Sequence, residues 1–344
     1  MSAPRRTRKY AGAPSVLERP TPSAVRIAVE LQPFTEAEGV AWPGARTARF
    51  YSLPDGIPAG KGIEALIPLV SHPVGAAELD LLPDLRVVAN YGVGHDNVDV
   101  TAAAERGITV TNTPGVLTEA TADLTLALIL GAARRLREGL ETATSGSWKG
   151  WGPTELLGLG LQDRVLGLLG AGRIGSAVAR RAAAFGMRIH YWSRRPNADL
   201  ETEFGAIRRD ELRDLLREAD VVSVHLPLTP HTEGLIGPDE LRLMQEHALL
   251  VNTARGAIVN EEALSAALAA GTIAGAGLDV YAQEPSISAA LAQHPRALLL
   301  PHLGSATHAA RQGMWGLAAA NARAVLEGRE APNPVRPRGG ASLR

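Results

Sequence analysis

Three polar side chains in the second half of the chain could together reduce a carbonyl group. Arg255 follows the apolar segment LLVNTA, Glu284 follows GLDVYAQ, and His302 follows LLLP. A protonated His can donate a proton to a carbonyl oxygen, a neighbouring carboxylate can keep that His protonated, and a guanidinium group can bind a carboxylate through two hydrogen bonds. Each of these residues alone is more often structural or solvated. Together they are the parts needed to reduce a 2-oxo acid by hydride transfer.

A glycine-rich turn upstream indicates where the hydride comes from. The chain runs through the apolar segment VLGLLG, turns through Gly170, Gly172 and Gly175, and continues into the helical pattern SAVARRAAAF and a second apolar segment. In such a unit the glycines allow a tight turn, close approach of a pyrophosphate and close helix packing, and the helix N-terminus attracts the anion. With 36 glycines in the chain, the spacing alone is weak evidence. The order strand, turn, helix, strand favours a dinucleotide site over a glycine turn without a ligand.

The end of the second strand narrows the choice of cofactor. An NAD site usually carries an acid there, which binds the ribose hydroxyls. This chain has Ser193, followed by Arg194 and Arg195. Because guanidinium groups suit a 2′-phosphate and an acid repels it, we expect a preference for NADP over NAD. The alternative is that both arginines are solvated loop charges.

Composition sets the outer bounds. The 344 residues, 45% of them hydrophobic, are enough for two domains. A net charge of −1 gives no global attraction to nucleic acid or to a membrane surface, and we expect neither partner. The absence of cysteine excludes disulfides and thiolate zinc sites and fits a cytoplasmic protein. We expect no metal site.

Short apolar segments alternate with helical patterns along the chain. We expect a helix that starts at Thr118, with the Thr118 side chain as its cap, and runs toward Arg137; a loop from Thr144 to Gly160; and a last helix over residues 308–326. The alternation predicts an α/β fold with two doubly wound Rossmann-like lobes. Strands are expected over residues 26–29, 65–69, 86–89, 108–111, 221–225, 249–252, 277–280 and 297–300.

Several motifs resemble the D-isomer-specific 2-hydroxyacid dehydrogenase family. The resemblance extends from about Glu64 to Gly328. Within the family, the chain is most similar to the glyoxylate and hydroxypyruvate reductases. The motifs that carry it are NYGVGHDNVD, NTPGVLTEATADLTLALIL, GAGRIG, HLPLTPHT, VNTARGAIVNEEAL, GLDVYAQEP and PHLGSAT. The resemblance implies NAD(P)H-dependent reduction of a small 2-oxo acid to the D-2-hydroxy acid, and the reverse.

The resemblance also implies roles for single residues. Arg255 would bind the substrate carboxylate and polarise the carbonyl, His302 would be the general acid, and Glu284 would pair with His302. Val93 and Gly94 would hold the substrate carboxylate through their backbone N–H groups. Formate dehydrogenases of this family use Gln in place of the Glu, but the register against the following proline assigns Glu284, not the adjacent Gln, to that position.

The cofactor site implied by the family is larger. Asp279 would meet the nicotinamide carboxamide, and Thr253 and Ala254 would line the nicotinamide pocket. The cofactor-binding residues would be Gly170, Gly172, Arg173, Ile174, Gly175, Ser193, Arg194, Arg195, Pro227, Thr253, Ala254, Asp279, His302 and Gly304.

The family fold implies a cofactor domain inserted into the substrate domain. The NAD(P)-binding domain would span residues 118–305, and the flavodoxin-like substrate domain would span 1–117 and 306–344, with a disordered tail over about 1–22. Family members are commonly homodimers, with the loop from Trp148 to Trp151 near the interface. An alternative function is a dinucleotide-sensing protein-binding module of the C-terminal-binding corepressor type, which shares this fold and keeps similar site residues.

Overall fold

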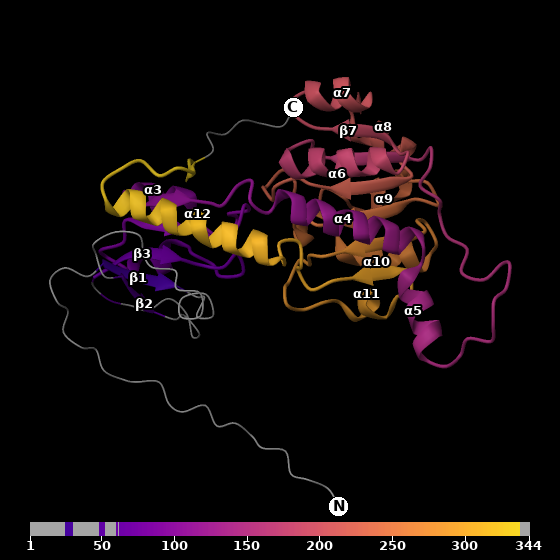
Figure 1. Cartoon of the computed structure of the whole chain (residues 1–344), viewed down its shortest axis with the longest axis horizontal. Coiled ribbons are helices and arrows are strands. Elements are labelled where there is room, and N and C mark those ends of the chain that lie inside the picture. Colours follow the sequence, from indigo (N-terminus) through magenta and orange to yellow (C-terminus); the bar gives the residue numbers. More distant parts are fainter. Residues whose placement is uncertain (1–24, 30–47, 52–59, 61, 338–344) are drawn as a thin grey trace, which may run out of the picture.

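The molecule is built on two mainly parallel β-sheets that lie side by side, each covered by helices (Figure 1). The structure is a computed structural model, and it describes residues 25–29, 48–51, 60 and 62–337. The fold class is as the sequence predicts, an α/β arrangement of two doubly wound lobes. The expected disordered tail over residues 1–22 lies outside the described residues.

The first sheet has the strand order β13-β5-β4-β3-β1-β2. All its strand pairs are parallel except the pair of β13 with β5. Its core order 2-1-3-4-5 is that of flavodoxin-like sheets. The strands are β1 (Val25–Val29), β2 (Ala48–Tyr51), β3 (Ile63–Ile67), β4 (Val87–Ala89), β5 (Thr109–Thr111) and β13 (Pro334–Val335).

Helices cover both faces of this sheet. On one face, α2 (Ala76–Asp80) and α3 (Val100–Glu105) pack on Leu66 and Val88. On the other face, α12 (His308–Leu326) packs Met314 and Trp315 against β3 and β4. Because α12 is the last helix, the chain returns to the first sheet after it has built the second (Figure 1).

The second sheet is fully parallel in the order β12-β11-β10-β9-β6-β7-β8. The order reverses between β6 and β9, and ligands bind at such a switch point outside the carboxyl ends of the strands. The strands are β6 (Val165–Leu169), β7 (Arg188–Trp192), β8 (Ile207–Arg208), β9 (Val221–Val224), β10 (Leu249–Asn252), β11 (Gly275–Leu278) and β12 (Ala297–Leu299).

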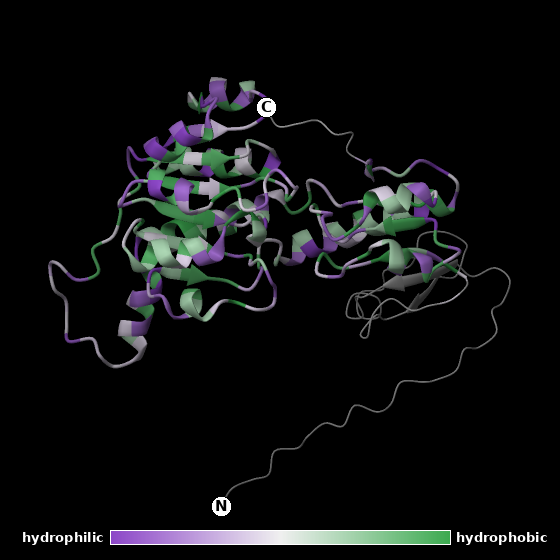
Figure 2. Cartoon of the chain, turned by 180° about the vertical axis from the view of Figure 1, so that it is seen from behind, coloured by the Kyte–Doolittle hydropathy of each residue, from purple (hydrophilic) through white to green (hydrophobic). Residues whose placement is uncertain are grey.

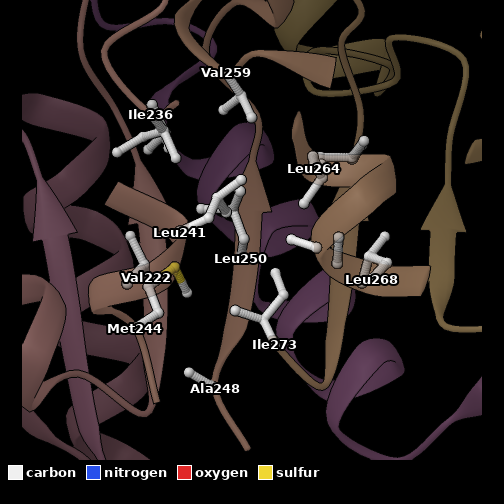
Figure 3. Close-up of a cluster of buried hydrophobic side chains, with 14 of the residues drawn as sticks. Val222, Ile236, Leu241, Met244, Ala248, Leu250, Val259, Leu264, Leu268 and Ile273 are labelled. Atoms are coloured by element: carbon white, nitrogen blue, oxygen red, sulfur yellow. The ribbon is translucent and has the colours of Figure 1, made fainter. Parts of the chain in front are cut away.

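Two hydrophobic layers hold the helices to the second sheet. Leu128 of α4 and Val178 of α6 pack on one face with Leu168 of β6. On the other face, Val222 and Leu250 meet the helices after β9 and β10 (Figure 3). The apolar colour is concentrated on the strands of the second sheet (Figure 2). The helices are α4 (Thr118–Ala133), α5 (Leu136–Thr144), α6 (Arg173–Ala184), α7 (Ala198–Phe204), α8 (Leu212–Glu218), α9 (Pro238–Leu243), α10 (Glu261–Ala269) and α11 (Ala289–Gln293), with the 3-10 turn η1 (Gly256–Ile258).

The expected helix start at Thr118 is confirmed, but the expected cap and the expected end near Arg137 are wrong. Leu117 is the N-cap and no side chain caps the helix, so Thr118 is its first residue and not its cap. At the other end Arg135 adopts a left-handed φ of 52° and breaks the helix into α4 and α5. The Ala133 carbonyl, free at the end of α4, accepts a hydrogen bond from the Leu159 N–H at 2.8 Å.

Other element predictions are confirmed with small shifts. The eight expected strands exist, and α12 spans the expected residues 308–326. The expected loop from Thr144 begins one residue later, because α5 includes Thr144. The sequence analysis missed β2, β8 and β13, of which two have only two residues. Among the described residues, no helix is long and apolar enough to cross a membrane.

Candidate active site

A cavity of about 460 Å³ lies where the carboxyl ends of the two sheets face each other. The loop after β4 contributes Val93 and Gly94 to its wall. The second sheet contributes Arg255 after β10, and Glu284 and His302 after β11 and β12. The structure therefore brings together the five residues that the sequence assigns to substrate binding and catalysis.

His302 and Glu284 form a close pair in this cavity. Nδ1 of His302 lies 2.8 Å from Oε2 of Glu284, and both side chains are about one third exposed, at 33% and 30%. The other carboxylate oxygen of Glu284 accepts the Tyr281 N–H at 3.0 Å. Nε2 of His302 has no partner among the described residues and remains available to a ligand.

The environment keeps Glu284 ionised. Burial on its own would raise the pKa of this carboxyl group. The hydrogen bond and the charge of His302 outweigh burial, with smaller help from the Tyr281 N–H and from Arg255, so the pKa of Glu284 lies below its usual value. A carboxylate that stays charged at neutral pH can accept a hydrogen bond from the imidazole beside it and fix its orientation.

The backbone at His302 is held in an unusual conformation. Its φ is +56°, in the left-handed region that costs a non-glycine residue roughly 1–2 kcal/mol. The buried Asp279 holds this turn through three hydrogen bonds. Its carbonyl accepts the His302 N–H at 2.9 Å, and its carboxylate oxygens accept the N–H groups of Leu303 at 2.6 Å and Gly304 at 2.8 Å. Burial raises the pKa of Asp279, and the two N–H groups oppose that shift.

Arg255 is aimed at the first half of the molecule. The Asn252 side chain shapes the turn before it, accepting the Ala254 N–H and donating to the Arg255 carbonyl. Nε of Arg255 donates to both carboxylate oxygens of Asp96, at 2.8 and 3.0 Å. Its guanidinium lies so close to Gly94 that a β-carbon there would be 1.7 Å from Nη2. Glycine at position 94 therefore leaves room for the Arg255 guanidinium in this position.

The loop that carries Gly94 offers free donors beside this guanidinium. Within the described part of the chain, the N–H groups of Val93 and Gly94 have no hydrogen-bond partner. Two backbone N–H groups next to an arginine form a place where a small carboxylate can bind.

The glycine turn after β6 fits a dinucleotide. Gly170 has a φ of +102°, and a β-carbon at Gly175 would lie 2.1 Å from the Gly170 carbonyl, so both positions require glycine for internal reasons. Gly172, the N-cap of α6, has nothing within 4 Å of its β-carbon position. That open side, at a helix start with unpaired N–H groups, is where a pyrophosphate can approach the backbone.

A larger cavity of about 990 Å³ extends from this turn and has room for the adenosine part of a dinucleotide. Ser193, Arg194 and Arg195 line it after β7. Arg194 and Arg195 are exposed and form no ion pair within the described residues, so their charges are available to an anion.

The remaining predicted cofactor residues divide between the two cavities. Gly175 is the exception, because it lines neither and packs against Gly170. Gly170 lines the larger cavity, and Gly172 and Pro227 line both. The smaller cavity is lined by Arg173, Ile174, Thr253, Ala254, Asp279, His302 and Gly304.

Known proteins are similar to this chain in sequence and in fold. The family model described as "D-isomer specific 2-hydroxyacid dehydrogenase, NAD binding domain" matches residues 126–304, more than half of the chain. A glyoxylate reductase of Thermococcus litoralis is 48% identical over 277 residues, which cover 79% of this chain and 83% of the relative. The chain belongs to the D-isomer-specific 2-hydroxyacid dehydrogenase family.

Solved structures agree with this membership. A protein of Thermus thermophilus is 45% identical with a TM-score of 0.79, over 90% of this chain and 99% of the other. An NADPH-dependent glyoxylate/hydroxypyruvate reductase of Sinorhizobium meliloti, in complex with NADP and malonate, is 35% identical with a TM-score of 0.81, over 92% and 100% of the two chains. The protein is thus an NAD(P)-dependent oxidoreductase of this dehydrogenase family.

The sequence analysis missed two contributors to the dehydrogenase site. One is Asp96, whose only signal is its place two residues after Gly94. The other is Thr125 of α4, fully buried, whose hydroxyl lies 2.9 Å from that of Thr253 and bonds the Thr121 carbonyl. Thr121 in turn donates to the Gly304 carbonyl at 3.1 Å. No local pattern marks these threonines, because their partners are 128 and 183 residues away in sequence.

Replacement of Gly94 by alanine should disrupt the carboxylate site. The new methyl group would displace the Arg255 guanidinium, and we expect the affinity for oxamate in the presence of NADPH to fall about tenfold or more by calorimetry. Gly316→Ala is the matched control, since nothing lies within 4 Å of its β-carbon position on α12. Equal oxamate affinity in the Gly94→Ala and Gly316→Ala variants would contradict the inference that glycine at position 94 gives Arg255 room to bind a carboxylate.

Proposed function

We propose that this enzyme is a glyoxylate/hydroxypyruvate-type reductase that prefers NADPH. Reduction of a small 2-oxo acid to the D-2-hydroxy acid with NAD(P)H is the activity of its family. The observation that carries the finer proposal is the pair of His302 and Glu284 across one cavity from Arg255 and the free N–H groups of Val93 and Gly94. The cavity of about 460 Å³ has room for a small 2-oxo acid beside the nicotinamide end of a dinucleotide.

The residues would divide the work as follows. Arg255 and the loop N–H groups bind the substrate carboxylate and orient the carbonyl toward His302. Nε2 of His302 donates a proton to the carbonyl oxygen while the Glu284 carboxylate, in contact with Nδ1, orients the imidazole and balances its charge. The dinucleotide, when bound, supplies the hydride that adds to the carbonyl carbon. One hydride and one proton then convert the ketone or aldehyde to the alcohol.

The cofactor would be held along the carboxyl edge of the second sheet. The first turn of α6, from Gly172 to Gly175, would bind the pyrophosphate, with Arg173 at the cavity wall. Thr253 and Asp279 would face the nicotinamide end. The alternative function, a binding module of the corepressor type, is not favoured, because the matched relatives are named as reductases.

We further propose a cytoplasmic homodimer with domain boundaries near residues 117/118 and 305/306. Exposed apolar side chains on α5 and the following loop support the dimer, because a partner subunit could cover them. This segment lies at the end of the molecule farthest from the first sheet (Figures 1 and 2). A monomeric mass in solution would contradict it. The exposed fractions are Leu136 56%, Leu140 66%, Trp148 63%, Trp151 85% and Leu157 66%.

The proposed activity is tested by the loss of NADPH absorbance at 340 nm on addition of glyoxylate or hydroxypyruvate. We expect turnover in the range of about 1–10³ per second. His302→Gln should lower it by about 10²–10⁴ while NADPH binding stays nearly intact. A chain that binds NADPH but consumes none with either acid would refute the reductase and favour the binding module.

Removal of the Glu284 charge should change the pH dependence. Because the pKa of Glu284 is lowered, its charge is present throughout the neutral range and stabilises the protonated His302. In Glu284→Gln that stabilisation is lost, so the reduction rate should begin to fall at a lower pH than in the unmodified enzyme. Rate profiles from pH 5 to 9 test this, and coincident alkaline limbs would rule out the pairing role.

The two arginines after β7 should decide cofactor preference. Replacing Arg194 and Arg195 with alanine should raise the Kd for NADPH about ten- to hundredfold and leave that for NADH almost unchanged, because only NADPH carries the 2′-phosphate. Arg213→Ala on α8, also exposed but outside both cavities, is the control. If the unmodified enzyme binds NADH and NADPH equally, the charge argument fails.

A further inference from the structure

One carboxylate in the cavity wall has no part in the proposed chemistry. Asp96 lines both cavities, and its side chain is 27% exposed. Its two oxygens lie 2.8 and 3.0 Å from Nε of Arg255, whose side chain is 21% exposed. Because Arg255 would bind the substrate carboxylate, the Asp96 carboxylate either competes with the substrate for the guanidinium or holds the guanidinium in position for it.

The geometry indicates that Asp96 supports substrate binding and does not compete with it, because Asp96 binds only Nε of the guanidinium. The N–H of Nε points to Asp96, and one N–H of Nη1 donates to the Ala254 carbonyl at 2.8 Å. Arginine has five such donors in a rigid plane, so three remain on the two terminal nitrogens. Nη2 is the atom nearest to Gly94. The free edge of the guanidinium thus faces the loop with the unpaired N–H groups.

Asp96 is itself held rigidly relative to that loop. The buried Asn90 donates to the Gly94 carbonyl at 2.7 Å and accepts a hydrogen bond from Asn97 at 3.0 Å. Asn97 also donates to two backbone carbonyls of the loop after β3. The positions of Asp96 and of the Val93 N–H are therefore set by one braced segment.

This ion pair also joins the two halves of the molecule. Asp96 follows β4 of the first sheet and Arg255 follows β10 of the second. The pair thus connects the half of the molecule built on the first sheet directly to the half built on the second. Arg255 would lose this contact if the halves moved apart.

We propose that Asp96 is a positioning residue, which holds Arg255 by Nε so that its terminal nitrogens and the Val93 and Gly94 N–H groups converge on one substrate carboxylate. This proposal rests on the proposed function of Arg255. It adds that the carboxylate site is assembled from both halves and exists only while the pair is intact.

The test compares Asp96→Ala with Asp96→Asn. The alanine variant should raise the KM for glyoxylate about ten- to hundredfold with a much smaller change in kcat, because the carboxylate is bound before and during the reaction. Asparagine keeps an oxygen that can accept the Nε hydrogen bond and should restore most of the loss. Asp80→Ala removes a similar carboxylate from Nε of Arg106, away from the site, and should leave both constants unchanged.

A double-mutant cycle separates this proposal from the proposed function. In the Arg255→Ala background, Asp96→Ala should reduce kcat/KM little further, because Asp96 acts through Arg255. A lower KM in Asp96→Ala would show that Asp96 competes with the substrate, and an equal loss in both backgrounds would show an independent role. Either result overturns the proposal. An unchanged KM in Arg255→Ala would instead overturn the proposed function.

Melting temperatures identify a purely structural effect. If Asp96 only stabilised the fold, Asp96→Ala and Asp96→Asn would lower the melting temperature and leave the KM for glyoxylate unchanged, and the proposal would fail. Guanidinium ions at millimolar concentration give a second measurement that does not depend on stability. They should restore activity to Arg255→Ala more than to the variant that also lacks Asp96.

Discussion

The buried carboxylate of Asp279 is the contact on which the catalytic end of the molecule depends. Its side chain is fully buried at the end of β11, and each of its oxygens accepts a backbone N–H from the turn after β12. A charge buried without such partners is very costly, so the turn at residues 302–304 and the carboxylate stabilise each other. The left-handed His302 is held in place by this exchange. The carbonyl of Gly304 in the same turn accepts a hydrogen bond from the Thr121 hydroxyl of α4.

The second constraint is that both sheets are parallel where they meet. All carboxyl ends of a parallel sheet lie on one edge, so two such edges that face each other bring loops from many strands to one cavity. This chain passes from the first sheet to the second and later returns to the first. Here the first passage leads into α4 and the second into α12, and residues far apart in sequence, such as Asp96 and Arg255, then come within hydrogen-bond distance.

The sequence predicts those parts of the fold and site that rest on local physics. The apolar segments before Gly170 and Arg255 are strands because their residues are buried on both faces of a parallel sheet, and this signal does not depend on distant contacts. The break at Arg135 could not be predicted in this way, since a loop 24 residues later pairs with the end of α4. Nor could the two-residue strand β13, which exists only because the chain returns beside β5. Asp96 was missed for the same reason, because its partner is 159 residues away.

Backbone strain by itself does not mark the site. Four non-glycine residues of the described chain have positive φ, namely Arg135, Leu156, Asp163 and His302, and of these only His302 lines the catalytic cavity. What distinguishes His302 is the buried Asp279, whose backbone carbonyl and two carboxylate oxygens each accept an N–H of its turn. The turn at His302 cannot relax without leaving the Asp279 carboxylate unpaired. The imidazole is therefore kept in one orientation against Glu284 in the described structure, which suits a group whose work is to deliver a proton to one point.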